Sequence, residues 1–410
     1  MIAPALLSGL ASVQELLRET LRQVPAEAAM CQLSPERPSL AWLFANAVYR
    51  EAYWLRERLD QDQDLTARAR VFFIRDTAAG GLTLDRQCAG LPPPPHLLAW
   101  AVEIQDEHLR RLATPGALPP HPLLEHDRLP WWLLQEHAKD YERMLAQRLA
   151  LVLAPVSAQE QGDASADYRV VTPLRAASLA DVMAAPAAMV EQGHYRVGAR
   201  GDAFAYDNEL PPQAVPLSAY RITRAPVSNA QYLAFMQAGG YQDAALWPEA
   251  GESTAARMPH PLQWRQDAAG RWFDVSLNGP ADLPAHAPVS GLDQAEAWAF
   301  ARWAARLGGA CAGAVLPHEY QWEVAARAGQ LEVAGSVWEW CAGPLHAYPE
   351  FMPFPGPESP SVAAFAAGAV TLKGAGLHTL PALRRASFRH WAMPDDRFAG
   401  AGLRLVLPPD

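Results

Sequence analysis

A short acidic segment of the chain contains residues that, by their types and spacing, could take part in chemistry. It reads LLQEHAKDYERML over residues 133–145 and places Glu136, His137, Asp140 and Glu142 within two helical turns. Residues four positions apart share one face of a helix, so Glu136 and Asp140 would lie side by side, whereas His137 is rotated by about 100°. Carboxylate and imidazole groups are common metal ligands, and the segment therefore raises the question of a metal site.

Helical periodicity surrounds this segment throughout the first part of the chain. Apolar residues recur at helical spacing in four long segments: 10–21, 40–52, 96–113 and 130–153. The last of these segments contains the acidic residues. Four such segments predict an antiparallel four-helix bundle over residues 1–153. Residues 154–185 are rich in Ala, Ser and Asp, and we predict that they form a linker or loose connection.

From residue 186 onward the pattern changes to short segments with many Gly, Pro and Trp residues. Two helices are expected, one over 228–239 with Ser228 as its N-cap and one over 293–308 with Asp293 as its N-cap. Short strands are expected at three places: 195–199, 370–376 and 402–408. These elements predict an α+β domain over residues 186–410, so that the whole chain is an α+β multidomain protein.

The composition limits the classes of function. The chain has 410 residues, enough for two domains, and a formal net charge of −10. The lack of a strongly basic character excludes nucleic acid and anionic membranes as expected partners. The 4 cysteines lie far apart, and no apolar run reaches about 18 residues, so we expect neither a disulfide framework nor a membrane span. The beginning of the sequence lacks the basic region of a signal peptide, and the expected location is cytoplasmic.

The second half contains an ordered set of motifs that resembles a known domain. In chain order they are FAYDNE (204–209), APVSNAQYLAFMQAGGY (225–241), PVSGLDQAEAWAFARWAARLG (288–308), LPHEYQWEVAAR (316–327), GSVWEW (335–340), YPEF (348–351) and FRHWAMPDDRFAGAGLRLV (388–406). Together they resemble the formylglycine-generating-enzyme, or sulfatase-modifying factor, type of domain, which has a C-type-lectin-like fold. Residues 371–406 lack the copper-binding cysteines of the formylglycine-generating enzyme itself, so the resemblance does not extend to that activity.

The first half also contains matching motifs, SPERPSLAWLFANAVYREAYWL (34–55) and GLPPPPHLLAWAVEIQDEHLRRL (90–112). A DinB-like bundle in front of this domain is similar to the non-haem iron sulfoxide synthases of ergothioneine biosynthesis, whose relatives make selenoneine. The resemblance implies an O2-dependent oxidoreductase with Fe(II) and a site in the cleft between the two domains. The implied substrates are a betaine amino acid (a trimethylated histidine) and a thiol or selenol, which are joined by a C–S or C–Se bond.

The three iron-binding histidines that the resemblance implies are replaced in this chain. One family histidine lies four residues after a tryptophan, and Trp42 is followed at that distance by Asn46. The other two histidines belong to the pattern H-x-x-x-H-x-E, which falls on Glu136, Asp140 and Glu142. The resemblance therefore implies Asn46, Glu136 and Asp140 as the metal-ligand positions.

Three interpretations of these positions stay open. The first is that the metal site is lost, with Arg50 and Arg143 as partners of the two carboxylates. The second is that the three side chains form an oxygen-rich site for Mg²⁺, Mn²⁺ or Ca²⁺. The third is that iron still binds, through the carboxylates or through His137. Accordingly, the protein is either an enzyme of the family or a non-catalytic protein, a pseudoenzyme, that binds a small molecule or a partner.

Further expectations from the resemblance concern the substrates. The substrate-binding candidates are Arg86, Arg389, His390 and Trp391. Among them, Arg86 matches an arginine that holds the carboxylates of the thiol substrate, and Trp391 is the candidate face for a quaternary ammonium group. Tyr348 is the candidate catalytic tyrosine, a proton donor near O2. A structural Ca²⁺ is an additional alternative at GSVWEW, where Ser336 replaces the usual Asn.

Overall fold

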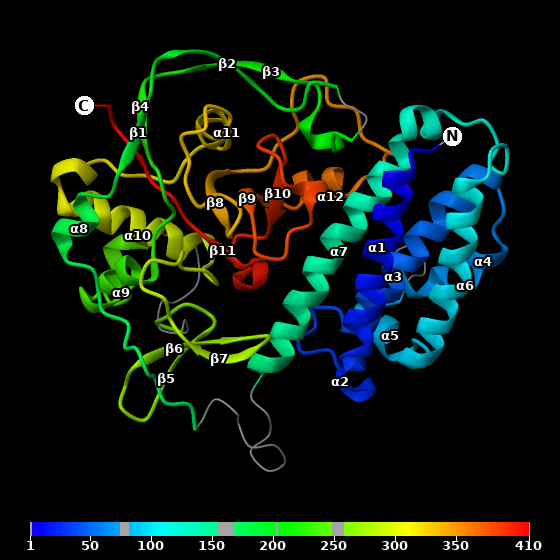
Figure 1. Ribbon diagram of the computed structural model, residues 1–410, viewed down its shortest axis with the longest axis horizontal. Helices are drawn as coiled ribbons and strands as arrows, with labels where there is room; N and C mark the ends of the chain where they lie inside the picture. Colours follow the sequence, from blue (N-terminus) through cyan, green and yellow to red (C-terminus); the bar gives the residue numbers. More distant parts are fainter. Residues whose placement is uncertain (1, 74–81, 155–166, 202–203, 248–257, 410) are drawn as a thin grey trace. The chain divides into compact units, whose positions relative to one another are not determined.

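The chain folds into two compact units, Met1–Ala154 and Pro155–Asp410 (Figure 1). The computed structural model describes residues 2–73, 82–154, 167–201, 204–247 and 258–409. Each unit has its own hydrophobic core. Within these described ranges, no helix is long and apolar enough to cross a membrane.

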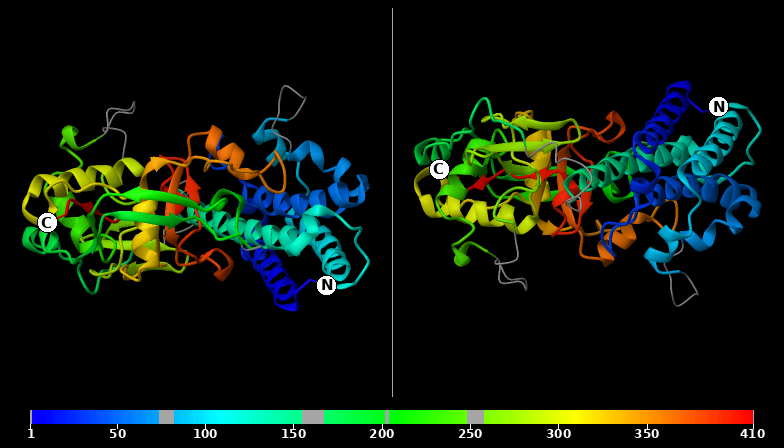
Figure 2. Two further views of the ribbon diagram at one scale, coloured as in Figure 1. Left: turned by 90° about the horizontal axis from the view of Figure 1, so that it is seen from above. Right: turned by 90° about the horizontal axis from the view of Figure 1, so that it is seen from below.

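The first unit is a helical bundle, as predicted. Its four long helices are α1 (Pro4–Arg22), α3 (Leu40–Ala52), α6 (Pro94–Ala113) and α7 (Arg128–Leu153) (Figure 2). Helices α1 and α3 each pack against both α6 and α7. The shorter segments are α2 (Ala26–Met30), the π-helix η1 (Tyr53–Arg58), α4 (Asp64–Ala67), η2 (Arg70–Phe72), α5 (Leu84–Ala89) and η4 (Pro122–Asp127).

Residues at the helix starts explain where these helices begin. The helix expected from residue 96 begins at Pro94, because proline lacks an N–H and fits the first helical turn. Ser39 caps α3, since its hydroxyl oxygen accepts a hydrogen bond from the backbone N–H of Trp42 at 3.2 Å.

The core of the bundle draws on all four long helices. It contains Leu17 of α1, Phe44 and Val48 of α3, Ile104 of α6 and Met144 of α7, each at most 3% exposed. Any polar side chain inside such a core needs a hydrogen-bonding or charged partner, because its burial is otherwise unfavourable.

The second unit is an α+β domain built on small sheets. Its strands are β1 (Ala187–Val190), β2 (Gly193–Val197), β3 (Gln213–Leu217), β4 (Tyr220–Thr223), β5 (Trp264–Gln266), β6 (Trp272–Ser276), β7 (Gly279–Asp282), β8 (Val337–Pro344), β9 (Val370–Ala375), β10 (His390–Ala392), β11 (Ala401–Gly402) and β12 (Val406–Leu407). The described strands form sheets in the orders β10-β9-β8-β11, β1-β4-β12, β5-β6-β7 and β2-β3. In the first of these sheets, Trp338 lies opposite Gly374 and Trp340 lies opposite Leu372.

Two helices of this unit, α9 (Asn229–Gln237) and α10 (Gln294–Leu307), begin at the predicted caps Ser228 and Asp293. The other described helices are α8 (Leu179–Met183), α11 (Glu319–Arg327) and α12 (Pro360–Ala366), with short turns η5 (Asp207–Glu209), η6 (Ala244–Leu246), η8 (Gly309–Cys311), η9 (Pro381–Leu383) and η10 (Arg397–Ala399). Ser228 and Gln231 form a capping box at α9, and Asp293 and Glu296 form one at α10. Gly308 ends α10 with a positive φ of 74°, which glycine adopts without steric cost.

Two expectations differ from the observed backbone. The strand expected over 402–408 is divided into β11 and β12. Between them, the carbonyl of Leu403 accepts a hydrogen bond from the N–H of Val227, outside the strands, and that of Leu405 accepts one from Thr223 at the end of β4. Of the segment 154–185, residues 155–166 lie outside the described residues, and part of the remainder forms the helix α8.

Candidate functional site

A buried group of charged side chains links α3 to α7 inside the bundle. The guanidinium of Arg50 pairs with Glu136 through one terminal nitrogen and with Asp140 through the other. Glu136 also accepts a hydrogen bond from the Lys139 ammonium at 2.7 Å, and Asp140 accepts one from Arg143 at 3.3 Å. Glu136 and Asp140 are 0% and 2% exposed, so both carboxylates depend on these cations for stabilisation.

The charges in this group determine its protonation. Burial alone would raise the pKa of Glu136, but the charges of Lys139, Arg50 and Arg143 outweigh burial and hold that pKa well below its usual range. Burial lowers the pKa of Lys139 to about 8, against the opposing attraction of Glu136. Near pH 7 the group therefore contains an ionised Glu136 next to positively charged neighbours.

A second buried group is centred on Glu51, near the end of α3. Its carboxylate accepts hydrogen bonds from His108 Nδ1 of α6 and His137 Nε2 of α7, both at 2.8 Å. The side-chain amide of Gln14 in α1 donates to the same carboxylate at 3.0 and 3.1 Å. His137 Nδ1 lies 4.0 Å from an Asp140 oxygen, so the two groups are neighbours. Glu51 thus joins all four long helices through polar contacts.

The bundle brings some of the predicted metal-ligand positions together. Glu136 and Asp140 lie side by side, and both contact Arg50, as the pairing considered from the sequence requires. Asn46 is a partly buried residue of α3, one turn before Arg50. His137 is directed to Glu51, which agrees with its expected rotation away from the other two residues.

Sequence reasoning missed Glu51, His108 and Lys139. Glu51 and His108 have partners on other helices, and no local spacing encodes such contacts. The only sequence signal for these two residues was the presence of polar residues within strongly apolar helices, where an unpaired polar group is costly. Lys139, by contrast, follows Glu136 by three residues, a spacing at which side chains on one helix meet, so this pair could have been found from the sequence.

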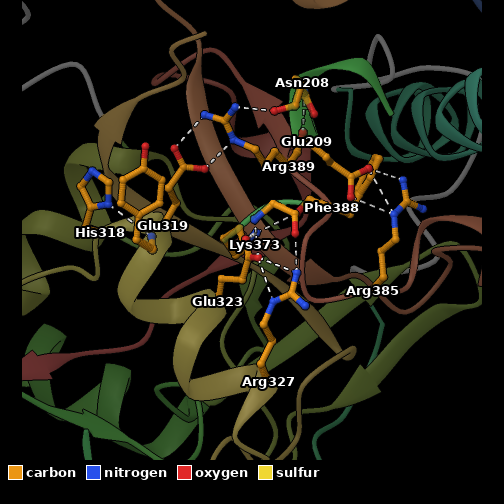
Figure 3. Close-up of polar contacts among 12 residues, drawn as sticks. Asn208, Glu209, His318, Glu319, Glu323, Arg327, Lys373, Arg385, Phe388 and Arg389 are labelled. Atoms are coloured by element: carbon orange, nitrogen blue, oxygen red, sulfur yellow. Dashed lines mark hydrogen bonds and ion pairs between the residues drawn. The ribbon is translucent and has the colours of Figure 1, made fainter. Parts of the chain in front are cut away.

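In the second unit, Arg389 is a buried anchor immediately before β10 (Figure 3). Its guanidinium donates to both carboxylate oxygens of Glu319, at 2.6 and 2.8 Å. It also donates to the carbonyl oxygens of Asn208 at 2.6 Å and His346 at 2.9 Å, and it lies 4.1 Å from the centre of the Tyr348 ring. Arg389 is 0% exposed, so its donors are directed to groups of the protein itself.

The FAYDNE segment is tied to the same region by hydrogen bonds. The Asn208 amide donates to the carbonyl of Arg389 at 3.1 Å, and Glu209 pairs with Arg385 (Figure 3). Asp207 accepts hydrogen bonds from the hydroxyls of Ser359 and Ser361. These contacts hold the loop after β8 against the segment before β3.

Tyr348 is buried in that loop, at 2% exposure. Its hydroxyl has no hydrogen-bond partner within the described part of the chain. Burial raises the pKa of Tyr348 well above its usual value, so the hydroxyl keeps its proton at neutral pH. The rings of Tyr320 and His346 lie 6.1 and 6.4 Å away.

The remaining substrate-binding candidates lie at partly or fully exposed positions. His390 and Trp391 are neighbours on β10, where the ring of His390 lies 4.6 Å from that of Trp338 and the ring of Trp391 lies 6.1 Å from that of Tyr206. Arg86 is an exposed residue of α5 in the bundle. The hydroxyl of Ser336, in the segment considered for calcium, donates to the carbonyl of Val333 at 2.9 Å.

The chain joins a helical bundle to an α+β domain. Residues 176–333 match the family described as "Sulfatase-modifying factor enzyme 1-like domain". This match confirms the domain type inferred from the motifs of the second half.

The chain is also similar to known proteins over part of its length. Hercynine oxygenase of Mycobacterium tuberculosis is 29% identical over 256 residues, which are 51% of this chain and 57% of that protein. Hercynine oxygenase of Mycolicibacterium thermoresistibile is 28% identical, over 50% of this chain and 55% of that protein. Formylglycine-generating enzyme of Thermomonospora curvata is 33% identical, over 36% of this chain and 50% of that protein. Over about half of its length the chain is a distant homologue of the hercynine oxygenases, and it spans between 50% and 57% of the length of these three relatives.

Proposed function

We propose that this protein binds small molecules of the hercynine type and holds no iron at Asn46, Glu136 and Asp140. The observation that carries the proposal is the pairing of Arg50 with both carboxylates. A guanidinium that donates to two carboxylates occupies the oxygen lone pairs that a metal ion needs, and it already supplies positive charge there.

The side chains at these positions do not fit Fe(II). Non-haem iron sites of the oxygenase type contain imidazole ligands, either two with a carboxylate or the three that the resemblance implies, whereas these positions offer one amide and two carboxylates. Across the residues that the structure describes, no group of three or more His, Cys, Asp or Glu side chains is arranged to hold a metal ion. An ion at Glu136 and Asp140 would also have to displace Arg50, which would leave a guanidinium without its buried partners.

The proposed ligand is a betaine amino acid such as hercynine, the compound in the names of the relatives. Trp391 is partly exposed, and its ring can attract a trimethylammonium group through the negative face of the π system. In this proposal Arg389 is a positioning residue, because Glu319 and two backbone carbonyls take up its donors. Arg389 holds the start of β10 and thereby places Trp391.

Two measurements test the proposal. The protein is loaded with Fe(II) under anaerobic conditions and desalted, and its metal content is determined by mass spectrometry. We expect well below one iron per chain and no O2 uptake with hercynine and a thiol. Calorimetric titration with hercynine should show binding that Trp391→Ala weakens about tenfold, consistent with the loss of one desolvated cation–π contact of about 1–2 kcal/mol. Val171→Ala, at a residue that is 83% exposed, is the control.

An oxygenase that joins a thiol or selenol to this ligand is the second function, and the distant homology to hercynine oxygenases favours it. Stoichiometric iron together with O2 uptake would establish the oxygenase and overturn the proposal. If hercynine does not bind at all, the proposed ligand class is wrong, whatever the metal content.

A further inference from the structure

A pocket in the second unit has no role in the function proposed above. Its volume is about 520 Å³, within the range of about 300–1,000 Å³ that is usual for small-molecule sites. Its lining residues come from α9 and the turn that follows it, from the segment before β5, and from β5 and β6. The residues that matter for its chemistry are Gln237, Tyr241, Gln242, His260, Arg265 and Trp272.

The wall and base of this pocket are fixed by a buried polar network. The hydroxyl of Tyr241 donates to Glu296 at 2.6 Å and lies 2.9 Å from the hydroxyl of Tyr232. Arg397 donates to Glu296 at 2.9 Å and also to the backbone carbonyl of His260. The aromatic wall and the His260 backbone are therefore held by the same buried ion pair, which is the kind of preorganisation that favours ligand binding.

The polar groups that line the pocket have unused hydrogen-bonding capacity. His260 Nδ1 donates to the carbonyl of Pro261 at 2.9 Å. Burial, together with the charges of Arg265 and Arg397, lowers the pKa of His260, so its ring is neutral at pH 7 and Nε2 is an acceptor. The described residues provide no partner for Nε2, nor for the exposed side-chain amides of Gln237 and Gln242.

An aromatic surface stands next to these polar groups. The indole of Trp272 lies 5.3 Å from the His260 ring and 5.8 Å from the buried Trp264, measured between ring centres. Trp272 is partly exposed and lines the pocket. An apolar ring face flanked by amides and a neutral imidazole suits a molecule that has both an apolar side and many hydroxyl groups.

The charges of the pocket argue against an ionic ligand. None of its described lining residues is acidic, which disfavours a cation. The one guanidinium among its described lining residues, that of Arg265, already donates to the backbone carbonyls of Leu262 and Trp264, both at 2.9 Å. A phosphate or a di-acid would need a cluster of cationic or backbone N–H donors, and one committed arginine does not provide it.

We propose that this pocket binds a neutral sugar, with the apolar face of the sugar ring on Trp272 and its hydroxyl groups bonded to Gln237, Gln242 and His260. The amides both donate and accept, and the imidazole accepts, so they match hydroxyl groups, which also do both. A site of this kind discriminates between sugars by leaving its polar groups unpaired when a hydroxyl is missing or misplaced.

The test uses the whole chain and a defined panel of sugars: glucose, mannose, galactose, N-acetylglucosamine, maltose and cellobiose. Saturation-transfer NMR identifies binders, and calorimetric titration measures their Kd values. We expect saturable binding of at least one sugar, about threefold weaker in Gln242→Ala and at least tenfold weaker in Gln242→Ala combined with His260→Phe. The His260→Phe change keeps a ring against Trp272 while removing the acceptor.

The matched control is Gln192→Ala, which removes an exposed amide of the same unit outside the pocket and should leave the Kd unchanged. Circular dichroism checks the fold of each variant, and Gln242→Ala alone decides the question if the double variant does not fold. Absence of binding across the panel, or binding that survives the loss of Gln242 and His260, would overturn the proposal. Hercynine binding should be the same in all these variants, which separates this test from that of the proposed function.

Discussion

At the scale of single residues, the bundle is organised around buried charges that stabilise each other. Glu136 and Asp140 are acceptable inside an apolar core only because Arg50 and Lys139 lie next to them. Such pairs contribute little to stability compared with apolar side chains of the same shape. Removing one partner nevertheless destabilises the protein strongly, because the other charge stays buried.

Replacement of Arg50 is expected to have a large effect on stability. Arg50→Met keeps much of the apolar stem but leaves two carboxylates without their shared partner, and we expect a loss of about 3–5 kcal/mol in the free energy of unfolding. Urea denaturation followed by circular dichroism measures this loss. Arg143→Ala is the matched control: its side chain is 41% exposed, and its removal should cost less than about 1 kcal/mol. Equal, small losses of stability in both variants would show that Arg50 does not stabilise the two buried carboxylates as expected.

Removal of the Tyr348 hydroxyl is expected to stabilise the protein, whereas replacement of Arg50 is expected to destabilise it. It is buried without a partner among the described residues, and an unsatisfied buried hydroxyl is unfavourable. Tyr348→Phe removes the hydroxyl but keeps the ring under Arg389, so we expect a gain of about 1 kcal/mol in unfolding free energy. In Tyr241→Phe, by contrast, the lost hydroxyl bonds to Glu296, and the variant should be less stable. A destabilised Tyr348→Phe protein would show that the hydroxyl has a bound partner, such as water.

At the scale of elements, capping groups connect the helix starts to the polar interior. Glu296 accepts from the backbone N–H of Asp293 at 2.9 Å as part of the capping box of α10, and it also accepts from Tyr241 and Arg397. Burial raises the pKa of Glu296 to about 7. One side chain thus closes the first turn of α10 and supports a wall of the pocket proposed to bind sugar.

This raised pKa makes stability depend on pH in a defined direction. Between the ordinary pKa of about 4.5 and the folded value of about 7, the folded state keeps a proton that the unfolded state has lost, so the contribution of Glu296 to stability falls as pH rises. Glu296→Gln removes this titration. The stability of the variant relative to the parent should therefore rise by about 1.4 kcal/mol for each pH unit across this interval, and it should be constant above it.

Urea denaturation at a series of pH values from 4 to about 8.5, in the usual range for such titrations, measures the Glu296→Gln difference. The control is Glu332→Gln, since the Glu332 side chain is 62% exposed and only loosely paired with Arg224. A stability difference that does not change with pH would show that Glu296 titrates like an exposed carboxyl.

At the scale of the whole molecule, the sequence predicted the architecture better than it predicted the polar contacts. Apolar periodicity was sufficient for the long helices, and the ordered motifs were sufficient for the second domain. The pairing of Arg50 with the acidic residues of α7 could also be predicted from the sequence, because the spacing along two adjacent helices restricts the possible partners. Contacts such as that of Glu51 with His108, and the pocket beside α9, depend on how separate elements pack, which no local pattern encodes.

The division into two units predicts how the chain unfolds. Each unit has a separate hydrophobic core, and compact units of this size usually unfold as separate cooperative blocks. Differential scanning calorimetry is therefore expected to resolve two transitions. Arg50→Met should shift only the bundle transition to lower temperature, by more than about 5 °C, because a loss of 1 kcal/mol moves the midpoint of a domain of this size by several degrees. Glu296→Gln should shift only the other transition, so that the two variants assign the two peaks. A single transition that moves as one in both variants would show that the units unfold together.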